Sequence, residues 1–240
     1  MLLIVVGGLL VIADRFGAAY AERLIADRVV EQVASQKASS AEPDVTIEGV
    51  PFLTQVASGK YQEIKILLRD FSGPAGEGRT IKMPLLDVRA RDVRAPLDTL
   101  RTRQGDIIAT TVTGAGTVDY ATLATLTGRE GVRLGEKNGK LAVTAPVKVL
   151  DQTVTVNGTA NLTVAEGNLV KMRFEQVTAE GLPSIPLVQN LLNNYAKQIS
   201  VDIRVPALPL GLAVQKVQPT ADGLVVTAGA SEVPLNAGGQ

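Results

Sequence analysis

The sequence predicts an α+β fold in which a long, curved antiparallel β-sheet carries amphipathic helices on its apolar face. Three observations support this prediction. From Asp44 onward, apolar and polar residues alternate with period two, which is typical of strands covered on one side only. Asn-Gly and Asp-Gly pairs separate some of these alternating segments, as they do in β-hairpins. Before Asp44, an apolar run is followed by a segment with helical periodicity.

The composition of the 240-residue chain excludes several classes of function. Lys+Arg 24 and Asp+Glu 24 balance, and only 3% of residues are aromatic, so no basic or stacking surface for nucleic acid is expected. The chain has no His and no Cys, which excludes Ser-His-Asp and Cys-His nucleophiles, disulfides and the usual zinc sites. We therefore expect no metal and no cofactor. Because 45% of residues are hydrophobic and few are aromatic, the chain can bury a large aliphatic surface.

Residues 1–13 form an almost wholly apolar run, which Asp14 and Arg15 end. Thirteen helical residues rise about 20 Å, less than the roughly 30 Å hydrocarbon core of a bilayer. The run has the length of the apolar part of a signal peptide, and residues 19–21 (Ala-Tyr-Ala) have the form of a cleavage site, but no basic residue precedes it. We expect residues 1–21 to be a signal peptide or a membrane anchor. A buried core helix is the alternative.

Residues 22–36 predict an amphipathic helix. Ile25, Val29 and Val33 recur at helical spacing, while Arg23 and Asp27 lie on the opposite side. Residues 37–43 form a short polar linker. We expect residues 22–43 to be this helix and linker, with the helix packed on a single domain of residues 44–240, because no longer linker divides the rest of the chain.

The clearest strand covers residues 153–164, where Val, Ala and Leu alternate with Thr and Asn. Twelve extended residues would reach about 40 Å, twice the length of a typical strand. The other alternating segments are residues 64–68, 108–112, 141–149, 170–174 and 224–228. Hairpin turns are expected at residues 137–139, 165–168 and 221–223.

Two more helices are predicted among the strands, which makes three in all. Asp119 is a suitable N-cap for a short helix that reaches Leu126 and is stopped by Gly128. The other follows Pro186, which suits a first helical turn. Its apolar stripe consists of Val188, Leu191, Leu192, Tyr195 and Ile199.

No catalytic motif is present: the chain has no phosphate-binding loop, no dinucleotide fingerprint, no nucleophile elbow and no calcium loop. A two-carboxylate glycosidase mechanism needs no His, and Asp87, Asp92 and Asp98 are the candidates for it. Arginines interleave with these residues, so ion pairs on the polar face of a strand explain the cluster better. Residues 60–103 hold ten Lys or Arg against six Asp or Glu. This excess could complement anionic lipid headgroups or form a solvated face.

Two segments carry a family resemblance. Residues 47–61 read IEGVPFLTQVASGKY, and residues 205–223 read VPALPLGLAVQKVQPTADG. The motif positions are Gly49, Pro51, Phe52, Leu53, Thr54, Gln55, Gly59 and Tyr61 in the first segment, and Pro206, Leu208, Pro209, Leu210 and Gly211 in the second. With the N-terminal apolar run, they resemble the actinobacterial envelope proteins related to the lipomannan elongation factor, a family of phospholipid-binding proteins.

The resemblance implies a fold similar to tubular lipid-binding (TULIP) proteins, in which a curved sheet wraps a long helix and encloses an apolar cavity for acyl chains. It implies a location on the periplasmic side of the cell envelope, exported or anchored by the N-terminal segment. It also implies a non-catalytic role in assembling mannosylated phosphatidylinositol glycolipids such as lipomannan. The implied partners are a phospholipid or glycolipid, the membrane and a membrane glycosyltransferase.

A cavity for acyl chains needs aliphatic walls, because each buried CH₂ contributes about 0.8 kcal/mol. The candidates for its wall or mouth are Phe52, Leu53, Leu187, Leu191, Tyr195, Leu208 and Leu210. Each could instead belong to an ordinary core, and the PFLTQ segment could be either a turn that seats Phe52 and Leu53 in the core or a lipid gate. Two other functions stay open: a structural or regulatory partner of a membrane glycosyltransferase without lipid cargo, and a carboxylate-based glycosidase.

Overall fold

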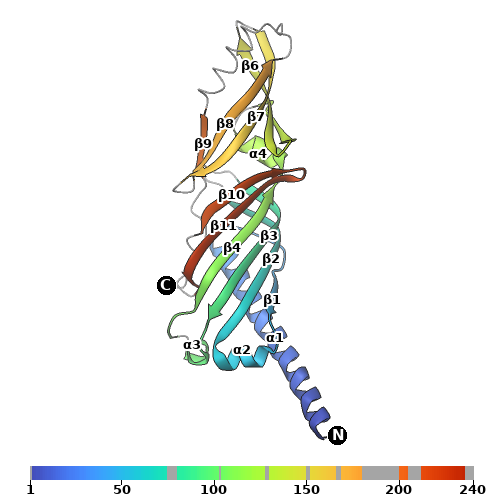
Figure 1. Ribbon diagram of the computed structural model, residues 1–240, viewed down its shortest axis with the longest axis vertical. Coiled ribbons are helices and arrows are strands. Elements are labelled where there is room, and N and C mark those ends of the chain that lie inside the picture. Colours follow the sequence, from blue (N-terminus) through green and yellow to red (C-terminus); the bar gives the residue numbers. More distant parts are fainter. Residues whose placement is uncertain are drawn as a thin grey trace.

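The computed structural model of the protein describes residues 2–74, 80–102, 104–127, 130–149, 152–165, 169–179, 200–204 and 212–235. In this part of the chain, two antiparallel sheets follow one another along an elongated molecule, and a long N-terminal helix lies beside the first sheet (Figure 1). The helices are α1 (Leu2–Ser35), α2 (Phe52–Ser58), α3 (Leu97–Thr102) and α4 (Tyr120–Leu126).

The first sheet has six strands in the order β1-β2-β3-β4-β11-β10, and the second has five in the order β5-β6-β7-β8-β9. The strands of the first sheet are β1 (Asp44–Glu48), β2 (Lys60–Pro74), β3 (Thr80–Arg94), β4 (Ile108–Val118), β10 (Ala213–Thr220) and β11 (Gly223–Pro234). Those of the second are β5 (Arg133–Lys137), β6 (Lys140–Val149), β7 (Gln152–Ala165), β8 (Leu169–Ala179) and β9 (Ser200–Arg204). All the recorded pairings are antiparallel, as predicted.

The strand predicted at residues 153–164 is confirmed as β7, which has 14 residues. Its pairing with β8 shifts register between Thr159 and Ala160, where β8 has one extra residue, Glu175, as in a β-bulge. The hairpin predicted at residues 137–139 is also confirmed. Asn138 and Gly139 both have positive φ, 55° and 74°, which is the conformation of a type I′ turn.

The helix predicted after Asp119 is confirmed as α4. The Thr122 N–H donates to Oδ1 of Asp119 over 2.8 Å, and the Thr122 hydroxyl donates to Oδ2 over 2.7 Å. These hydrogen bonds to Thr122 lower the pKa of the Asp119 carboxyl. The carboxylate therefore satisfies a backbone donor that the first turn leaves unpaired.

α1 continues without a break across residues 21 and 22. Ala18 is buried, and Ile25, Val29 and Val33 are half-buried, so the predicted apolar stripe is the side that faces the domain. α1 contacts β1 and α2. None of the helices in the described residues is long and apolar enough to pass through a membrane.

The prediction of three helices was incomplete, because α2 and α3 were not foreseen. The PFLTQ segment, residues 51–55, is predicted to be a turn or a lipid gate, whereas Phe52–Ser58 is helical. The helix predicted after Pro186 falls outside the described residues.

Two apolar cores hold the sheets. The larger core joins α1, α2 and the first sheet, and its most buried members include Val93, Ala109 and Val112. The smaller core lies on the second sheet, where Leu141, Ala160 and Met172 are buried beside Tyr120 of α4. The buried residues Val112, Leu141, Ala160, Met172 and Ala228 all belong to apolar faces predicted from the alternation, whereas Ala109, which is also buried, does not.

Candidate functional site

The segment G-V-P-F-L-T-Q, residues 49–55, forms the junction between α1, α2 and the first sheet. Gly49 has φ 99°, a conformation that residues with a side chain rarely adopt. A Cβ at this position would also lie 2.8 Å from Oε1 of Gln62. The backbone conformation therefore favours glycine here, and any side chain would also have to displace the flexible end of Gln62.

The Phe52 ring attaches α1 to the sheet. It is buried, and it lies against Tyr61 of β2 with ring centroids 6.3 Å apart at an interplanar angle of 47°. On its other side, Cε1 of Phe52 comes within 3.3 Å of the place where a Cβ of residue 17 would be. Gly17 thus lets the helix approach the ring closely.

Gln55 is buried, and both the nitrogen and the oxygen of its side-chain amide are hydrogen-bonded. Its Nε2 donates to the carbonyl oxygens of Glu48 (3.2 Å) and Gly49 (2.9 Å), and its Oε1 accepts from the Gln62 N–H over 2.9 Å. A side-chain amide supplies both donors and an acceptor, which a carboxylate does not. Gln55 therefore ties the ends of β1 and β2 to α2.

Asp14 of α1 supplies the cap that α2 lacks locally. The N-cap residue of α2 is Pro51, which makes no side-chain cap hydrogen bond. Instead, the Leu53 N–H donates to Oδ1 of the buried Asp14 over 2.7 Å. This hydrogen bond lowers the pKa of the Asp14 carboxyl, aided by the Phe52 N–H and Arg15 and opposed by burial.

We expect the junction to weaken in acid. The pKa of Asp14 is lower in the folded than in the unfolded chain, so its contribution to stability is present above about pH 4 and is lost as the pH falls through the folded pKa. Asp14→Asn should therefore reduce the loss of stability on acidification, measured as urea midpoints from pH 7 to pH 3. Asp222→Asn, in the exposed turn between β10 and β11, is the control. Equal pH dependence in the wild type and Asp14→Asn would contradict the role of the charge.

Gly59 ends α2 and joins it to α3. Its φ of 64° is the left-handed conformation typical of a residue that ends a helix. Its carbonyl accepts from the Ala95 N–H over 2.9 Å, and a Cβ here would lie 2.9 Å from Cα of Pro96. The backbones of α2 and of the segment before α3 are therefore in direct contact.

The structure brings together most of the first motif and leaves three of its residues exposed. Gly49, Phe52, Gln55, Gly59 and Tyr61 build the junction, whereas Pro51, Leu53 and Thr54 are exposed. Of the two candidate cavity residues described, Phe52 is thus a core residue and Leu53 a surface one. The other positions predicted for the cavity or the motif lie outside the described residues: Leu187, Leu191, Tyr195, Pro206, Leu208, Pro209, Leu210 and Gly211.

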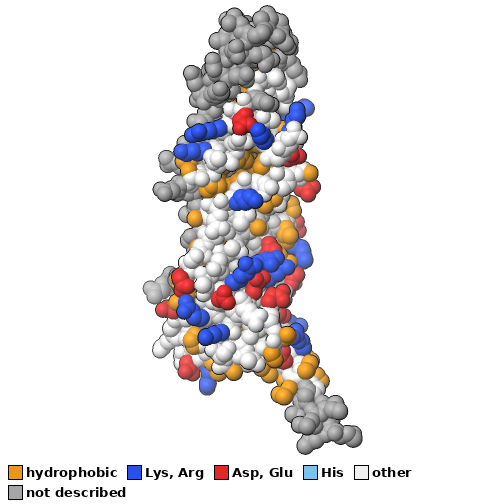
Figure 2. Space-filling view, in the orientation of Figure 1, with side chains coloured by type: hydrophobic (Ala, Val, Ile, Leu, Met, Phe, Trp, Pro, Cys, Tyr) orange, Lys and Arg blue, Asp and Glu red, His pale blue; other side chains and the backbone are white. Residues whose placement is uncertain are grey.

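Large hydrophobic side chains are exposed where α1 leaves the body of the protein. Leu9, Leu10, Val11 and Ile12 are each more than half exposed, and Phe16 is 74% exposed. At the adjoining end of the first sheet, Val50, Leu53, Leu97 and Leu100 are also exposed. Figure 2 shows hydrophobic side chains on the protruding helix and at this end of the molecule. Of these four residues, only Leu53 was predicted from the sequence as a candidate site residue, although the i, i+3 spacing of Leu97 and Leu100 signals a shared helix face.

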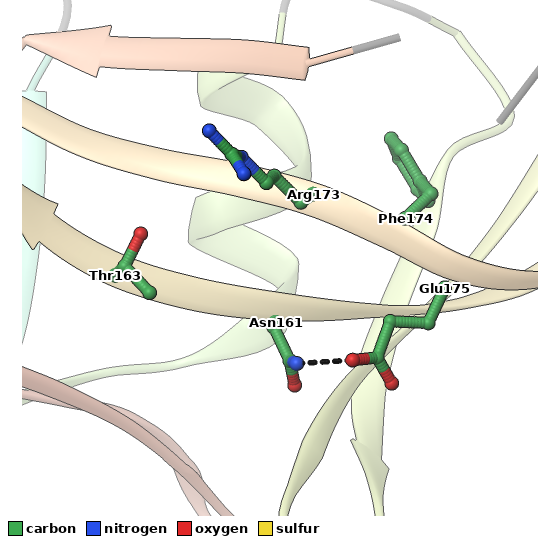
Figure 3. A pocket seen from close by; sticks show the side chains of 5 residues that line it. All are labelled: Asn161, Thr163, Arg173, Phe174 and Glu175. Atoms are coloured by element: carbon green, nitrogen blue, oxygen red, sulfur yellow. Dashed lines mark hydrogen bonds between the residues drawn. The ribbon is translucent and has the colours of Figure 1, made fainter. Parts of the chain in front are cut away.

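An open pocket of about 680 Å³ lies on the second sheet, lined by Asn161 and Thr163 of β7 and by Arg173, Phe174 and Glu175 of β8 (Figure 3). Nδ2 of Asn161 donates to Oε1 of Glu175, and Lys140 forms an ion pair with the same carboxylate. Asn161 and Thr163 belong to the Thr and Asn face predicted for β7. Within the described residues, no group of three or more potential metal ligands is present.

Two of the three candidate catalytic carboxylates, Asp87 and Asp92, lie too far apart to act as a pair. Asp87 and Asp92 are five residues apart on β3, about 17 Å along an extended strand, whereas glycosidase carboxyl groups lie about 5–9.5 Å apart. Asp98 lies in α3, not on the strand. Asp87 is instead bound to Arg89, whose NH2 lies 2.9 Å from its Oδ2. The predicted explanation by ion pairs thus holds for Asp87.

Several of the basic side chains at residues 60–103 form ion pairs on the sheet. Arg89 and Arg91 both contact Glu63 of the neighbouring strand, at 3.4 Å and 2.6 Å. Arg94 pairs with Glu232 of β11 at 2.8 Å. Ion pairs at such half-exposed positions contribute little to stability. They also leave less free charge for anionic headgroups than the sequence alone indicated.

In the described residues, aliphatic cores lie under antiparallel sheets and a helix exposes apolar residues, which is an arrangement suited to binding apolar ligands. The comparisons with known proteins agree with this interpretation. The sequence model of the LmeA-like phospholipid-binding family matches residues 12–229, and the chain belongs to this family. This confirms the resemblance seen in the sequence. Searches of curated proteins and of solved structures gave no match.

Proposed function

We propose that the protein binds phospholipid at the membrane on the periplasmic side of the cell envelope and carries, presents or senses it during assembly of mannosylated phosphatidylinositol glycolipids such as lipomannan. The observation that carries this proposal is membership of a phospholipid-binding family over residues 12–229. The proposed mode of binding is TULIP-like, with acyl chains held in an apolar cavity and without catalysis.

The surface of α1 supports the membrane part of the proposal. Leu9, Leu10, Val11 and Ile12 are consecutive and exposed, and successive residues of a helix point about 100° apart. The helix is therefore apolar around its whole circumference at this level, which requires apolar surroundings on all sides. Tyr20 and Arg23 follow further along the exposed helix, as aromatic and basic residues do at a membrane–water interface.

The covered faces of the sheets support the lipid part. Their residues are mainly Val, Ala, Leu and Ile, and aliphatic walls suit acyl chains because each buried CH₂ contributes about 0.8 kcal/mol. Leu187, Leu191, Tyr195, Leu208 and Leu210 stay predicted wall residues. Leu53 is an exposed candidate for the mouth, while the packing of Phe52 favours a structural role for that ring.

The experiment is lipid identification on the full chain purified from membranes in mild detergent. We expect native mass spectrometry and solvent extraction to find bound phospholipid, and the emptied protein to take phospholipid up from vesicles. A protein that arrives empty and takes up no lipid would contradict the proposal. Crosslinking of such an empty protein to a membrane glycosyltransferase would instead support the alternative of a partner without lipid cargo.

A further inference from the structure

Four exposed hydrophobic side chains form what we call the apolar rim: Val50, Leu53, Leu97 and Leu100. Outside α1, the described residues contain only five strongly exposed large hydrophobic side chains, and these four lie at one end of the first sheet. The fifth, Leu85, lies nine residues before Arg94 on β3, about 30 Å from that end. Scattered hydrophobic residues are normal on a surface, but a concentration of this kind marks an interaction site.

The residues of the rim come from three segments that lie next to one another. Val50 and Leu53 flank the start of α2, and Leu97 and Leu100 lie in α3. α2 and α3 contact one another, and the hydrogen bond from the Ala95 N–H to the Gly59 carbonyl fixes their backbones together. The rim thus has a rigid support.

α1 leaves the body beside the rim. The contact of Gly17 with the Phe52 ring and the hydrogen bond between Asp14 and the Leu53 N–H place this point of α1 at the start of α2. From there the helix projects beyond the sheet toward its N-terminus (Figure 1). The exposed apolar residues of α1 and the rim therefore lie on the same end of the molecule (Figure 2).

We propose that the rim lies in the headgroup region of the same phospholipid bilayer that receives α1, so that this end of the first sheet rests on the membrane. The inference rests on the proposed function, which places α1 in a membrane. A bilayer fits better than a protein groove, because a groove covers one face of a helix, whereas residues 9–12 of α1 are exposed and apolar on all sides. Lys60 and Arg101, exposed next to the rim, can reach lipid phosphates.

The test uses the absence of Trp from the chain. The single substitutions Leu97→Trp and Leu100→Trp each place one fluorophore on the rim of the full-length protein. Leu85→Trp is the matched control, because Leu85 and Leu97 are each 44% exposed and Leu100 is 42% exposed. Vesicles of phosphatidylglycerol and phosphatidylcholine with brominated acyl chains should quench the two rim reporters and leave the Leu85→Trp reporter unquenched. A Leu97→Ser/Leu100→Ser variant should bind these vesicles about tenfold more weakly than wild type.

Two outcomes would overturn the inference. The first outcome is that brominated lipids quench the rim reporters no more than the Leu85→Trp reporter, although the protein binds vesicles and carries phospholipid. This result would show that the rim does not lie in the membrane, and it would leave the proposed function intact. A self-association that shields the rim reporters without vesicles, seen by analytical ultracentrifugation, would assign the rim to a second copy of the chain. Absence of bound phospholipid in the purified protein is a separate result, which contradicts the proposed function itself.

Discussion

Replacing Leu9 and Phe16 together by serine is expected to lower the affinity for phospholipid vesicles about a hundredfold. Both side chains are exposed, at 61% and 74%, so their loss removes nothing from the core. Burying a Leu or Phe side chain contributes about 1.5–3 kcal/mol, and each 1.4 kcal/mol is a factor of ten in affinity. Two such residues entering the acyl region thus account for a loss of this size. Cosedimentation with vesicles over a range of lipid concentrations measures it.

The matched control is Val30→Ser. Val30 is 49% exposed on the same helix, but it follows the charged residues Asp27 and Arg28, beyond the part of α1 that we place in the membrane. Its replacement should leave vesicle binding unchanged. Thermal unfolding of the Leu9→Ser/Phe16→Ser variant should match the wild type, since surface substitutions usually change stability by less than about 0.5 kcal/mol. A folded double variant with wild-type affinity would show that α1 is not the element that binds the membrane.

The strands could be predicted because their signals are local. In β7, apolar residues alternate with Thr and Asn along almost the whole strand, and the hairpin between β5 and β6 is set by Asn138 and Gly139. Neither signal depends on distant parts of the chain. The same is true of α4, where Asp119 caps a helix that starts at the next residue.

α2 could not be predicted because its support is tertiary. The helix has seven residues, and its N-cap residue is a proline without a capping side chain. Short helices are unstable in isolation. The carboxylate that satisfies Leu53 comes from Asp14, 39 residues earlier, and no local pattern links the two. This separation in sequence also explains why Phe52 and Leu53 were both predicted as cavity residues. Only the contact with α1 shows that Phe52 is buried and Leu53 exposed.

The rim was missed for a related reason. Its four residues come from the segment before and within α2 and from α3, and only the fold brings them to one end of the sheet. In the sequence, Leu97 and Leu100 are ordinary apolar residues beside Asp98 and Arg101. The family motif, by contrast, could be recognised without the fold, but its role could not. Most of it builds the junction that holds α1, and Pro51, Leu53 and Thr54 are exposed.

Phe52→Ala is expected to reduce the free energy of unfolding by about 3–5 kcal/mol, the usual range for truncating a buried phenylalanine. The ring fills the space between Gly17 of α1 and Tyr61 of β2, and Gly17 has no side chain that could move into the cavity. The surroundings therefore cannot collapse easily, which places the cost toward the upper part of the range. Since domains are stable by only about 5–15 kcal/mol, the variant should lose a large share of its stability. Urea unfolding followed by far-ultraviolet circular dichroism measures it in a chain without tryptophan.

Leu53→Ala separates packing from exposure at the neighbouring position. Leu53 is 40% exposed, so its truncation should cost less than about 1.5 kcal/mol. The two variants should therefore differ in stability and in vesicle binding. Phe52→Ala lowers the stability of the fold, whereas Leu53→Ala keeps the fold and weakens vesicle binding through the rim. Equal stabilities for the two would mean that the Phe52 ring does not hold α1 on the sheet. The exposed part of α1 is attached to the domain through this ring and Asp14. Without the Phe52 contact, α1 should therefore still bind vesicles but no longer hold the sheet against the membrane. Brominated lipids should then quench a Leu97→Trp reporter less strongly in the Phe52→Ala variant than in the otherwise unchanged protein.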